Sequence, residues 1–267
     1  MSLLIQISDT HFGTEQAAVV AALYRLTQAL KPDVAILSGD ITQRARSRQF
    51  AAARRFLDEL HVPKVMSIPG NHDIPLLDVF ARMLYPYRNY MRAFGAELEP
   101  QLDCEAFRIV ALNTTRPTRH KNGEVSPHQI ERVTEQLRAA RPTQLRIVVT
   151  HQPVQVMHPQ DVENLLIGHE AAARAWVGAG ADLMMGGHIH LPYVLPLKRM
   201  FPGLSRSAWV VQAGTAISSR TRAGIPNSVN VVHHECGAIS CGIERWDFQA
   251  TAGAFTCVAR EQLVLDR

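Results

Sequence analysis

The chain has 267 residues, of which 46% are hydrophobic and 19% charged, and its formal net charge is +4. These values are typical of an ordinary globular chain, long enough for one large domain or two small ones. The mild excess of arginine suits anionic, phosphate-bearing substrates without requiring nucleic acid, and no apolar run reaches membrane-spanning length.

The cysteines and the N-terminus indicate the compartment. Cys104, Cys236, Cys241 and Cys257 form no C-x-x-C pair and have no zinc-finger spacing, which favours reduced thiols. The first residues carry no basic leader, and their apolar run reaches Asp9 too soon for a signal peptide. We therefore expect a cytoplasmic protein that does not associate with a membrane.

The N-terminal two thirds of the chain alternates short apolar runs with amphipathic segments, which is the pattern of a parallel sheet with crossover helices. In chain order, we expect a strand at 3–7, a helix at 17–30, strands at 34–37 and 64–68 around a helix at 49–60, a strand at 107–112, a helix at 127–139, a strand at 145–150, a helix at 170–177 and a strand at 181–185.

Two segments depart from this pattern. Residues 75–95 form a longer helical segment rich in Leu, Met, Phe and Tyr, which we interpret first as core packing and second as a lid or a dimer contact. After residue 190, strands are expected at 209–212, 228–233, 238–246 and 255–259, forming a second, more antiparallel sheet that closes against the first. No linker or repeat is visible, so we predict one domain over residues 1–267, with a helical lid or cap around 75–100.

Five of the predicted strands end in side chains that bind metals. These are Asp9 with His11, Asp40, Asn71 with His72, His151, and His188 with His190. Any one of these motifs alone is typical of an ordinary turn after a strand, but together the side chains would converge on one sheet edge. Carboxylate, imidazole and amide ligands suit manganese, iron, zinc or cobalt better than a calcium cage or a thiolate zinc site. The set is too large for one ion and suits two.

The order of these motifs resembles the calcineurin-like metallophosphoesterase superfamily. The elements are Asp-x-His, Gly-Asp, Gly-Asn-His-Asp, a later His and Gly-His-x-His, spanning residues 9 to 190. The resemblance implies an α/β fold with a two-sheet β-sandwich flanked by helices, in an α/β/β/α arrangement. It also implies a phosphoric ester hydrolase with two transition-metal ions.

The resemblance further implies roles for individual residues. Asp9, His11 and His190 would bind one metal, and Asn71, His151 and His188 the other, with Asp40 bridging them. His72 would orient the phosphate and protonate or stabilise the leaving oxygen, and Asp73 would fix its ring. A metal-bridging hydroxide would attack phosphorus.

Within the superfamily, the chain looks most like class III cyclic nucleotide phosphodiesterases and related bacterial phosphodiesterases. We therefore expect hydrolysis of a cyclic nucleotide or another small phosphodiester, with a phosphomonoesterase as the second choice. A nuclease is third, because the arginines at 44–55 lie on or beside an amphipathic helix without interleaved aromatic residues. An inactive scaffold would have lost a ligand or His72, and this chain has lost neither.

Substrate contacts are open at this stage. The candidates are the Tyr85, Tyr87 and Tyr90 cluster and the segments 116–121 and 219–222. Any arginine there could pair with phosphate, although a solvated loop charge is the simpler interpretation. A homodimer is a further possibility.

Overall fold

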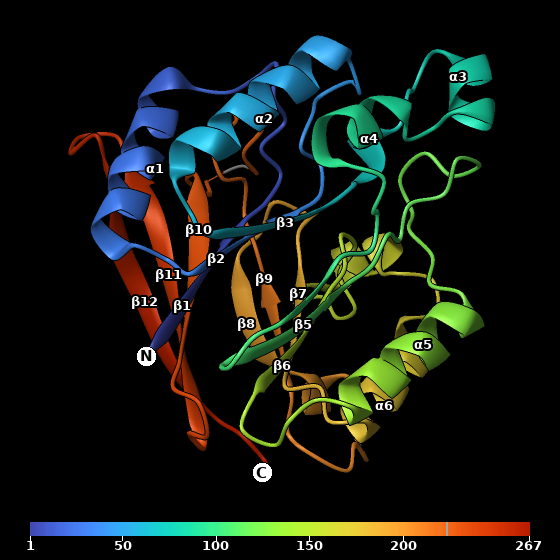
Figure 1. The fold of residues 1–267 in the computed structure, drawn as a ribbon, viewed down its shortest axis with the longest axis vertical. Helices are drawn as coiled ribbons and strands as arrows, with labels where there is room; N and C mark the ends of the chain where they lie inside the picture. Colours follow the sequence, from blue (N-terminus) through green and yellow to red (C-terminus); the bar gives the residue numbers. More distant parts are fainter. Residues whose placement is uncertain (223) are drawn as a thin grey trace.

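The computed structural model describes residues 1–222 and 224–267. Two six-stranded mixed sheets pack against each other, and helices cover their outer faces (Figure 1). Three hydrophobic clusters fill the layers: one between the sheets, one between the first sheet and its helices, and one between the second sheet and its helices. The predicted α/β/β/α sandwich is therefore confirmed.

The first sheet has the strand order β12-β11-β10-β1-β2-β3. Its strands are β1 (Ser2–Ile7), β2 (Val34–Ser38), β3 (Lys64–Ile68), β10 (Ser228–His234), β11 (Ser240–Gln249) and β12 (Ala254–Val264). The first three are parallel, and β10 joins β1 antiparallel. Leu4 faces the other sheet and Ile5 faces the helices, because successive side chains of a strand point to opposite faces.

The second sheet has the order β4-β5-β6-β7-β9-β8. Its strands are β4 (Gln101–Asp103), β5 (Phe107–Ala111), β6 (Leu145–Val149), β7 (Leu183–Gly186), β8 (Tyr193–Pro196) and β9 (Trp209–Gln212). Four consecutive strands of the order, β5, β6, β7 and β9, are parallel. Their carboxyl ends therefore lie along one edge of this sheet.

The helices divide between the two outer faces. The first sheet is covered by α1 (Ala17–Leu30) and α2 (Ser47–Leu60), and the second by α5 (Pro127–Arg138) and α6 (His169–Gly178). Short 3-10 helices η1 (Asn71–Asp73), η2 (Pro159–Asn164) and η3 (Leu197–Arg199) lie in loops. No helix of the described residues is long and apolar enough to cross a membrane. All four cysteines in this part of the chain are free, as expected.

Two sequence expectations differ from the structure. The expected helical segment at 75–95 is split into α3 (Val79–Leu84) and α4 (Arg88–Phe94), with Pro86 between them, where a residue without an N–H cannot continue a helix. The C-terminal strands do not form the second sheet: β10, β11 and β12 extend the first one, and only β9 joins the other. The short strands β4 and β8 were not expected.

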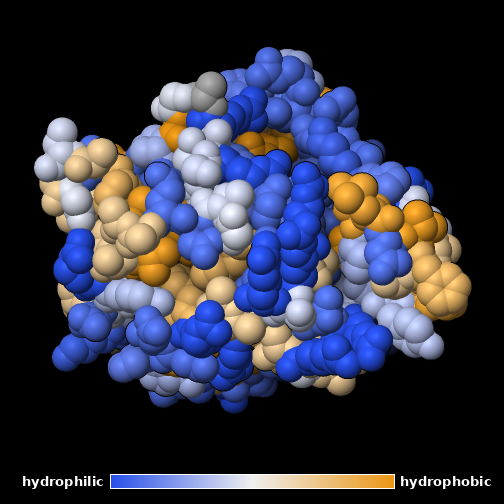
Figure 2. All heavy atoms as spheres, turned by 90° about the horizontal axis from the view of Figure 1, so that it is seen from above, coloured by the Kyte–Doolittle hydropathy of each residue, from blue (hydrophilic) through white to orange (hydrophobic). Residues whose placement is uncertain are grey.

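The surface of α3 and of the residues just before it is unusually apolar. Leu77, Val79 and Phe80 are 87%, 67% and 75% exposed, and Met83 and Leu84 are also exposed. Viewed from above, this helix gives the hydrophobic area at the right edge of the molecule (Figure 2). An exposed apolar area of this kind marks a surface available for contact.

Candidate metal centre

The polar strand ends meet where the two sheets adjoin. β1, β2 and β3 of the first sheet supply Asp9 with His11, Asp40 and Asn71, while β6 and β7 of the second supply His151 and His188 with His190. The expected gathering is therefore found, but across the edges of two sheets. The backbone N–H of His188 donates to Asp9 at 3.1 Å, which ties the two edges together.

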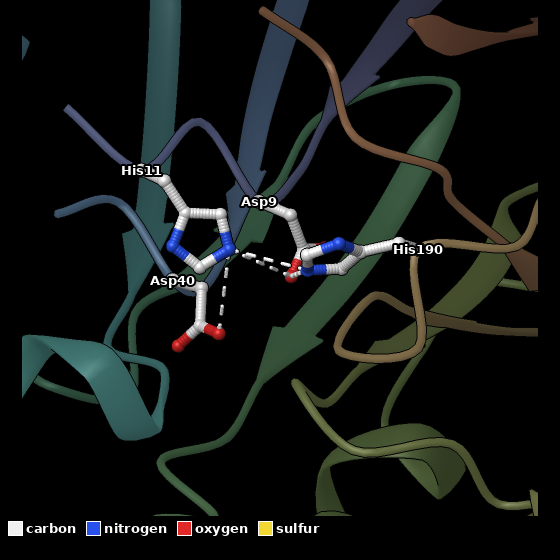
Figure 3. A group of neighbouring side chains, drawn as sticks. All are labelled: Asp9, His11, Asp40 and His190. Atoms are coloured by element: carbon white, nitrogen blue, oxygen red, sulfur yellow. Dashed lines mark hydrogen bonds and ion pairs between the residues drawn. The ribbon is translucent and has the colours of Figure 1, made fainter. Parts of the chain in front are cut away.

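One group of side chains contains Asp9, His11, Asp40 and His190 (Figure 3). Nε2 of His11 lies 3.2 Å from Nε2 of His190, 3.9 Å from Oδ1 of Asp9 and 3.8 Å from Oδ2 of Asp40. Nε2 of His190 lies 3.3 Å from Oδ1 of Asp9. Two imidazole nitrogens and two carboxylates facing one point form a donor set suited to a transition-metal cation.

A second group contains Asp40, His151 and His188. Nε2 of His151 lies 3.2 Å from Oδ1 of Asp40, and the rings of His151 and His188 are 5.2 Å apart. Asn71 lines the same pocket as Asp40 and His188. Because Asp40 belongs to both groups through different oxygens, the geometry suits a pair of ions sharing one carboxylate.

Buried polar atoms without hydrogen-bond partners also fit a metal pair. Among the described residues, Oδ1 of Asn71, Nε2 of His151 and both ring nitrogens of His188 are buried without a hydrogen-bond partner. Buried polar atoms are normally satisfied, and leaving one unpaired costs about 1–3 kcal/mol. Four such atoms in one place are explained if cations bind them.

Backbone carbonyls orient two of the imidazoles. Nδ1 of His151 lies 2.8 Å from the carbonyl of Ser38, and Nδ1 of His190 lies 2.5 Å from the carbonyl of Arg220. A carbonyl can only accept, so each Nδ1 carries a proton and Nε2 is the nitrogen of each ring that faces the site. Metal-binding histidines are commonly held in this way.

Burial and charge set the protonation of the group. Burial lowers the pKa of His11 and of His188 to about 3, which keeps both rings neutral. Burial would raise the pKa of Asp40, but nearby imidazoles, His151 foremost, lower it well below its ordinary value. Burial also opposes protonation of His151, yet the carboxylate of Asp40 outweighs it and raises the pKa of His151 to about 9.

The backbone at these positions is strained. Asp9, His11, Asp40, His188 and His190 all have positive φ, between 42° and 74°. Non-glycine residues rarely adopt this conformation, and such strain costs about 1–3 kcal/mol per residue and clusters at functional sites. The chain therefore bends sharply at the end of each of these strands in order to turn the side chains inward.

His72 and Asp73 lie in η1, beside the two groups. The ring of His72 is 4.9 Å from that of His11, and its Nδ1 lies 3.0 Å from the carbonyl of Gln43. Asp73 makes no hydrogen bond to this ring, so the expectation that it fixes the ring is wrong, and the Gln43 carbonyl does so instead. The Asp73 carboxylate accepts hydrogen bonds from Ile41 N, Thr42 N, Thr42 Oγ1 and Gly70 N.

A cavity of about 330 Å³ opens above the site. Its base is formed by Asp40, Asn71, His72, His188 and His190, and its walls by Gln43, Arg44, Ile74, Leu76, His120, Lys121 and Arg220. The only carboxylate among these lining residues is Asp40. Since the walls carry three basic side chains, the cavity is suited to an anion.

The candidate substrate contacts separate into two kinds. Lys121 and Arg220 reach the cavity, whereas Arg116 donates to Gln129 and Arg222 pairs with Asp161. Tyr90 is buried and bonded to Ser67, Tyr87 donates to Thr115, and Tyr85 is exposed just after the end of α3. The tyrosine cluster therefore does not line the site.

Gln43 was not singled out from the sequence. It lies in the loop after Asp40, where its carbonyl meets His72 and its side chain accepts from Arg220 at 3.0 Å. A glutamine in a loop carries no motif, so only its position three residues after Asp40 could have drawn attention to it.

Comparison with known proteins agrees with this geometry. The chain is 27% identical over 188 residues to the glycerophosphodiester phosphodiesterase GpdQ of Enterobacter lignolyticus, covering 64% of each chain. It is 25% identical over 204 residues to a probable cyclic nucleotide phosphodiesterase of a Synechococcus species, covering 72% of this chain and 74% of that one. The first match thus spans less than two thirds of the relative's length.

Solved structures show the same fold. A purple acid phosphatase from yellow lupin superposes with a TM-score of 0.75 at 13% identity, covering 99% of this chain and 54% of that one. Residues 3–192 match the family described as calcineurin-like phosphoesterase, which includes every strand end of the site. The chain therefore belongs to the calcineurin-like phosphoesterase family.

Proposed function

We propose that the protein is a binuclear metal-dependent phosphodiesterase that hydrolyses a small phosphodiester. The observation that carries this proposal is the pair of donor groups sharing Asp40, with unpartnered buried donor atoms, at the base of a basic cavity. In this proposal Asp9, His11 and His190 hold one ion, Asn71, His151 and His188 hold the other, and Asp40 holds both.

The ions would be manganese, iron, zinc or cobalt, given the mixed oxygen and imidazole donors. When bound, a pair of such ions polarises phosphoryl oxygens and lowers the pKa of a shared water. The protein residues arrange this chemistry. Asn71 adds an oxygen without adding charge, so the site stays receptive to an anionic phosphate.

His72 is proposed as the residue that serves the leaving group. Hydrolysis forms a bond from a water oxygen to phosphorus and breaks the bond from phosphorus to the alcohol oxygen, which then needs a proton. Because Nδ1 of His72 donates to the Gln43 carbonyl, Nε2 is the nitrogen that faces the cavity. A protonated Nε2 could pass its proton to the alcohol. Asp73 is proposed to act by positioning this loop, through its four hydrogen bonds.

The preference for a diester is supported by the two relatives, one named as a glycerophosphodiester phosphodiesterase and the other as a probable cyclic nucleotide phosphodiesterase. A cavity of about 330 Å³ is also of a size for a small substrate. The segment 75–100 is proposed as a lid, because Leu76 lines the cavity and α3 begins three residues later with its apolar side exposed. The homodimer and the cytoplasmic location stay predictions.

The test is a substrate panel. Purified protein would be loaded with manganese, iron, zinc or cobalt and given bis(p-nitrophenyl) phosphate, p-nitrophenyl phosphate, cyclic nucleotides and glycerophosphodiesters. The proposal expects metal-dependent turnover with higher kcat/KM for diesters than for monoesters. The reverse preference would make the protein a phosphomonoesterase, and no turnover with any metal would favour a binding scaffold.

A further inference from the structure

Arg220 is the basic side chain most closely integrated into the candidate site. It lies in the loop between β9 and β10, outside the residues 3–192 that match the family. Its Nη1 donates to Oε1 of Gln43 at 3.0 Å and lies 3.2 Å from Nε2 of His72. The same nitrogen is 3.4 Å from Nδ1 of His11. The guanidinium is therefore in contact with the proposed catalytic and metal-binding histidines.

The loop that carries Arg220 is firmly anchored. The backbone N–H of Arg220 donates to Oγ of Ser218 at 3.1 Å. The carbonyl of Arg220 accepts from Oγ1 of Thr215 at 3.1 Å and from Nδ1 of His190. Two residues on, Arg222 forms an ion pair with Asp161 at 3.1 Å. These contacts fix the backbone, so the Arg220 side chain is held at the cavity and is not a freely solvated loop charge.

In the described part of the chain, no carboxylate forms an ion pair with the guanidinium of Arg220. Among the ion pairs of the described residues, Arg222 is matched with Asp161 and Lys121 with Glu163, but none involves Arg220. The side-chain hydrogen bonds of Arg220 among the described residues all involve Nη1, which leaves the Nε and Nη2 edge of the guanidinium available. A half-buried guanidinium without a carboxylate, in a site that already suits two cations, lacks an anionic partner.

We propose that Arg220 is a phosphate-binding catalytic residue, whose free edge binds non-bridging oxygens of the substrate's phosphate beside His72. A planar guanidinium presents parallel donors that match phosphate oxygens, and such charge-assisted bonds are strong. Gln43 fixes the guanidinium from the opposite side, so little ordering is needed when the phosphate arrives. This proposal rests on the proposed function, since it assigns a residue to the same site.

The alternative is that Arg220 acts only by orienting His72. Both roles would lower turnover when Arg220 is replaced, so activity alone does not separate them. Binding of orthophosphate, compared with and without the His72 side chain, does separate them, because a residue that acts only through His72 contributes nothing to phosphate affinity once His72 is removed. Orthophosphate binding is also measurable without turnover, so the result is independent of the substrate panel.

The experiment compares Arg220→Gln and Arg220→Lys with the wild type and with Arg199→Gln. Arg199 is an exposed arginine in η3, at the end of β8 remote from His190. Each protein is loaded with manganese, its metal content and circular dichroism are recorded, and orthophosphate affinity is measured by calorimetry. We expect Arg220→Gln to weaken phosphate binding about 10- to 100-fold, the loss of a charge-assisted hydrogen-bond pair. Arg220→Lys should have an intermediate phosphate affinity, because lysine keeps the charge but lacks the two parallel donors of a guanidinium. Arg199→Gln should bind phosphate as the wild type does.

A double variant tests the alternative directly. If Arg220 binds phosphate itself, Arg220→Gln weakens phosphate binding by the same factor in a His72→Ala background. A loss that disappears in that background would overturn the proposal, as would wild-type affinity in Arg220→Gln at equal metal content. Failure of the wild-type protein to bind orthophosphate would overturn it as well. Misfolding of Arg220→Gln would be seen in the circular dichroism. In that case the orthophosphate affinity of Arg220→Lys tests the proposal, and wild-type affinity in this variant would overturn it.

Discussion

Replacement of Asp73 by asparagine is the substitution whose effect follows most directly from the contacts in the structure. The carboxylate is 1% exposed, and four donors surround it. Oδ1 accepts from Thr42 N at 2.7 Å and Thr42 Oγ1 at 2.8 Å, while Oδ2 accepts from Ile41 N at 3.0 Å and Gly70 N at 2.9 Å. The side chain thus ties the loop after Asp40 to the loop that carries Asn71 and His72.

Asparagine cannot reproduce this arrangement, because one of its two terminal groups is a donor. If the amide nitrogen replaces Oδ2, the N–H groups of Ile41 and Gly70 both lose their acceptor. If it replaces Oδ1, the N–H of Thr42 loses its acceptor, while the hydroxyl of Thr42 can rotate and accept. The second orientation is the less costly one. It leaves one buried N–H unpaired and removes the charge from the other bonds, so Asp73→Asn should cost about 3 kcal/mol of unfolding free energy.

The assay is urea unfolding at pH 8 with a chelator present, so that metal binding does not contribute. Burial, followed by the charge of Asp40, raises the pKa of Asp73 to about 6, so the carboxylate is ionised at pH 8. Asp78→Asn is the matched control: Asp78 accepts from Ala81 N at 2.9 Å at the start of α3, and asparagine caps helices equally well. Equal urea midpoints for the two variants would refute the assigned role of Asp73.

Three further predictions concern the site and its scaffold. His72→Ala should keep two metal ions and lose about 10²- to 10⁴-fold in kcat, since its proposed role is proton donation; unchanged turnover at saturating metal would remove that role. Gly70→Ala should lower the metal content, because a Cβ at this position would clash with the backbone N and Oδ1 of Asp40. Gly178→Ala is the control: there is open space around Gly178, so this variant should bind metal as the wild type does. Metal analysis of both proteins tests the prediction. Asp182→Ala should lower the free energy of unfolding in urea by about 3–5 kcal/mol, because it leaves Arg206 and Arg267 without their buried carboxylate partner. A change under about 1 kcal/mol would contradict a stabilising role for these ion pairs.

The fold and the metal-site residues could be predicted because their signals are local. Residues 64–68 and 209–212 were expected as strands and are strands, since short apolar runs bounded by turn residues specify buried strands. Parallel strands end at one edge, so polar residues following each strand were expected to gather. Asp9, Asp40 and His188 do lie together.

The remaining features depend on contacts between distant parts of the chain. The pairing of β10 with β1 decides that the C-terminal strands join the first sheet, and no local pattern specifies it. The same holds for Arg220, which meets Gln43 across 177 residues of sequence. Asp73 was assigned to the ring of His72 because the two are adjacent in sequence, but the backbone of η1 turns its side chain toward the loop after β2.

The central claim is that this chain holds two metal ions that share Asp40. Anomalous diffraction from crystals grown with manganese tests it most directly. The account predicts two peaks about 3.5–4 Å apart, one among Asp9, His11 and His190 and the other among Asn71, His151 and His188, with Asp40 between them. A single peak, or peaks away from these side chains, would contradict it.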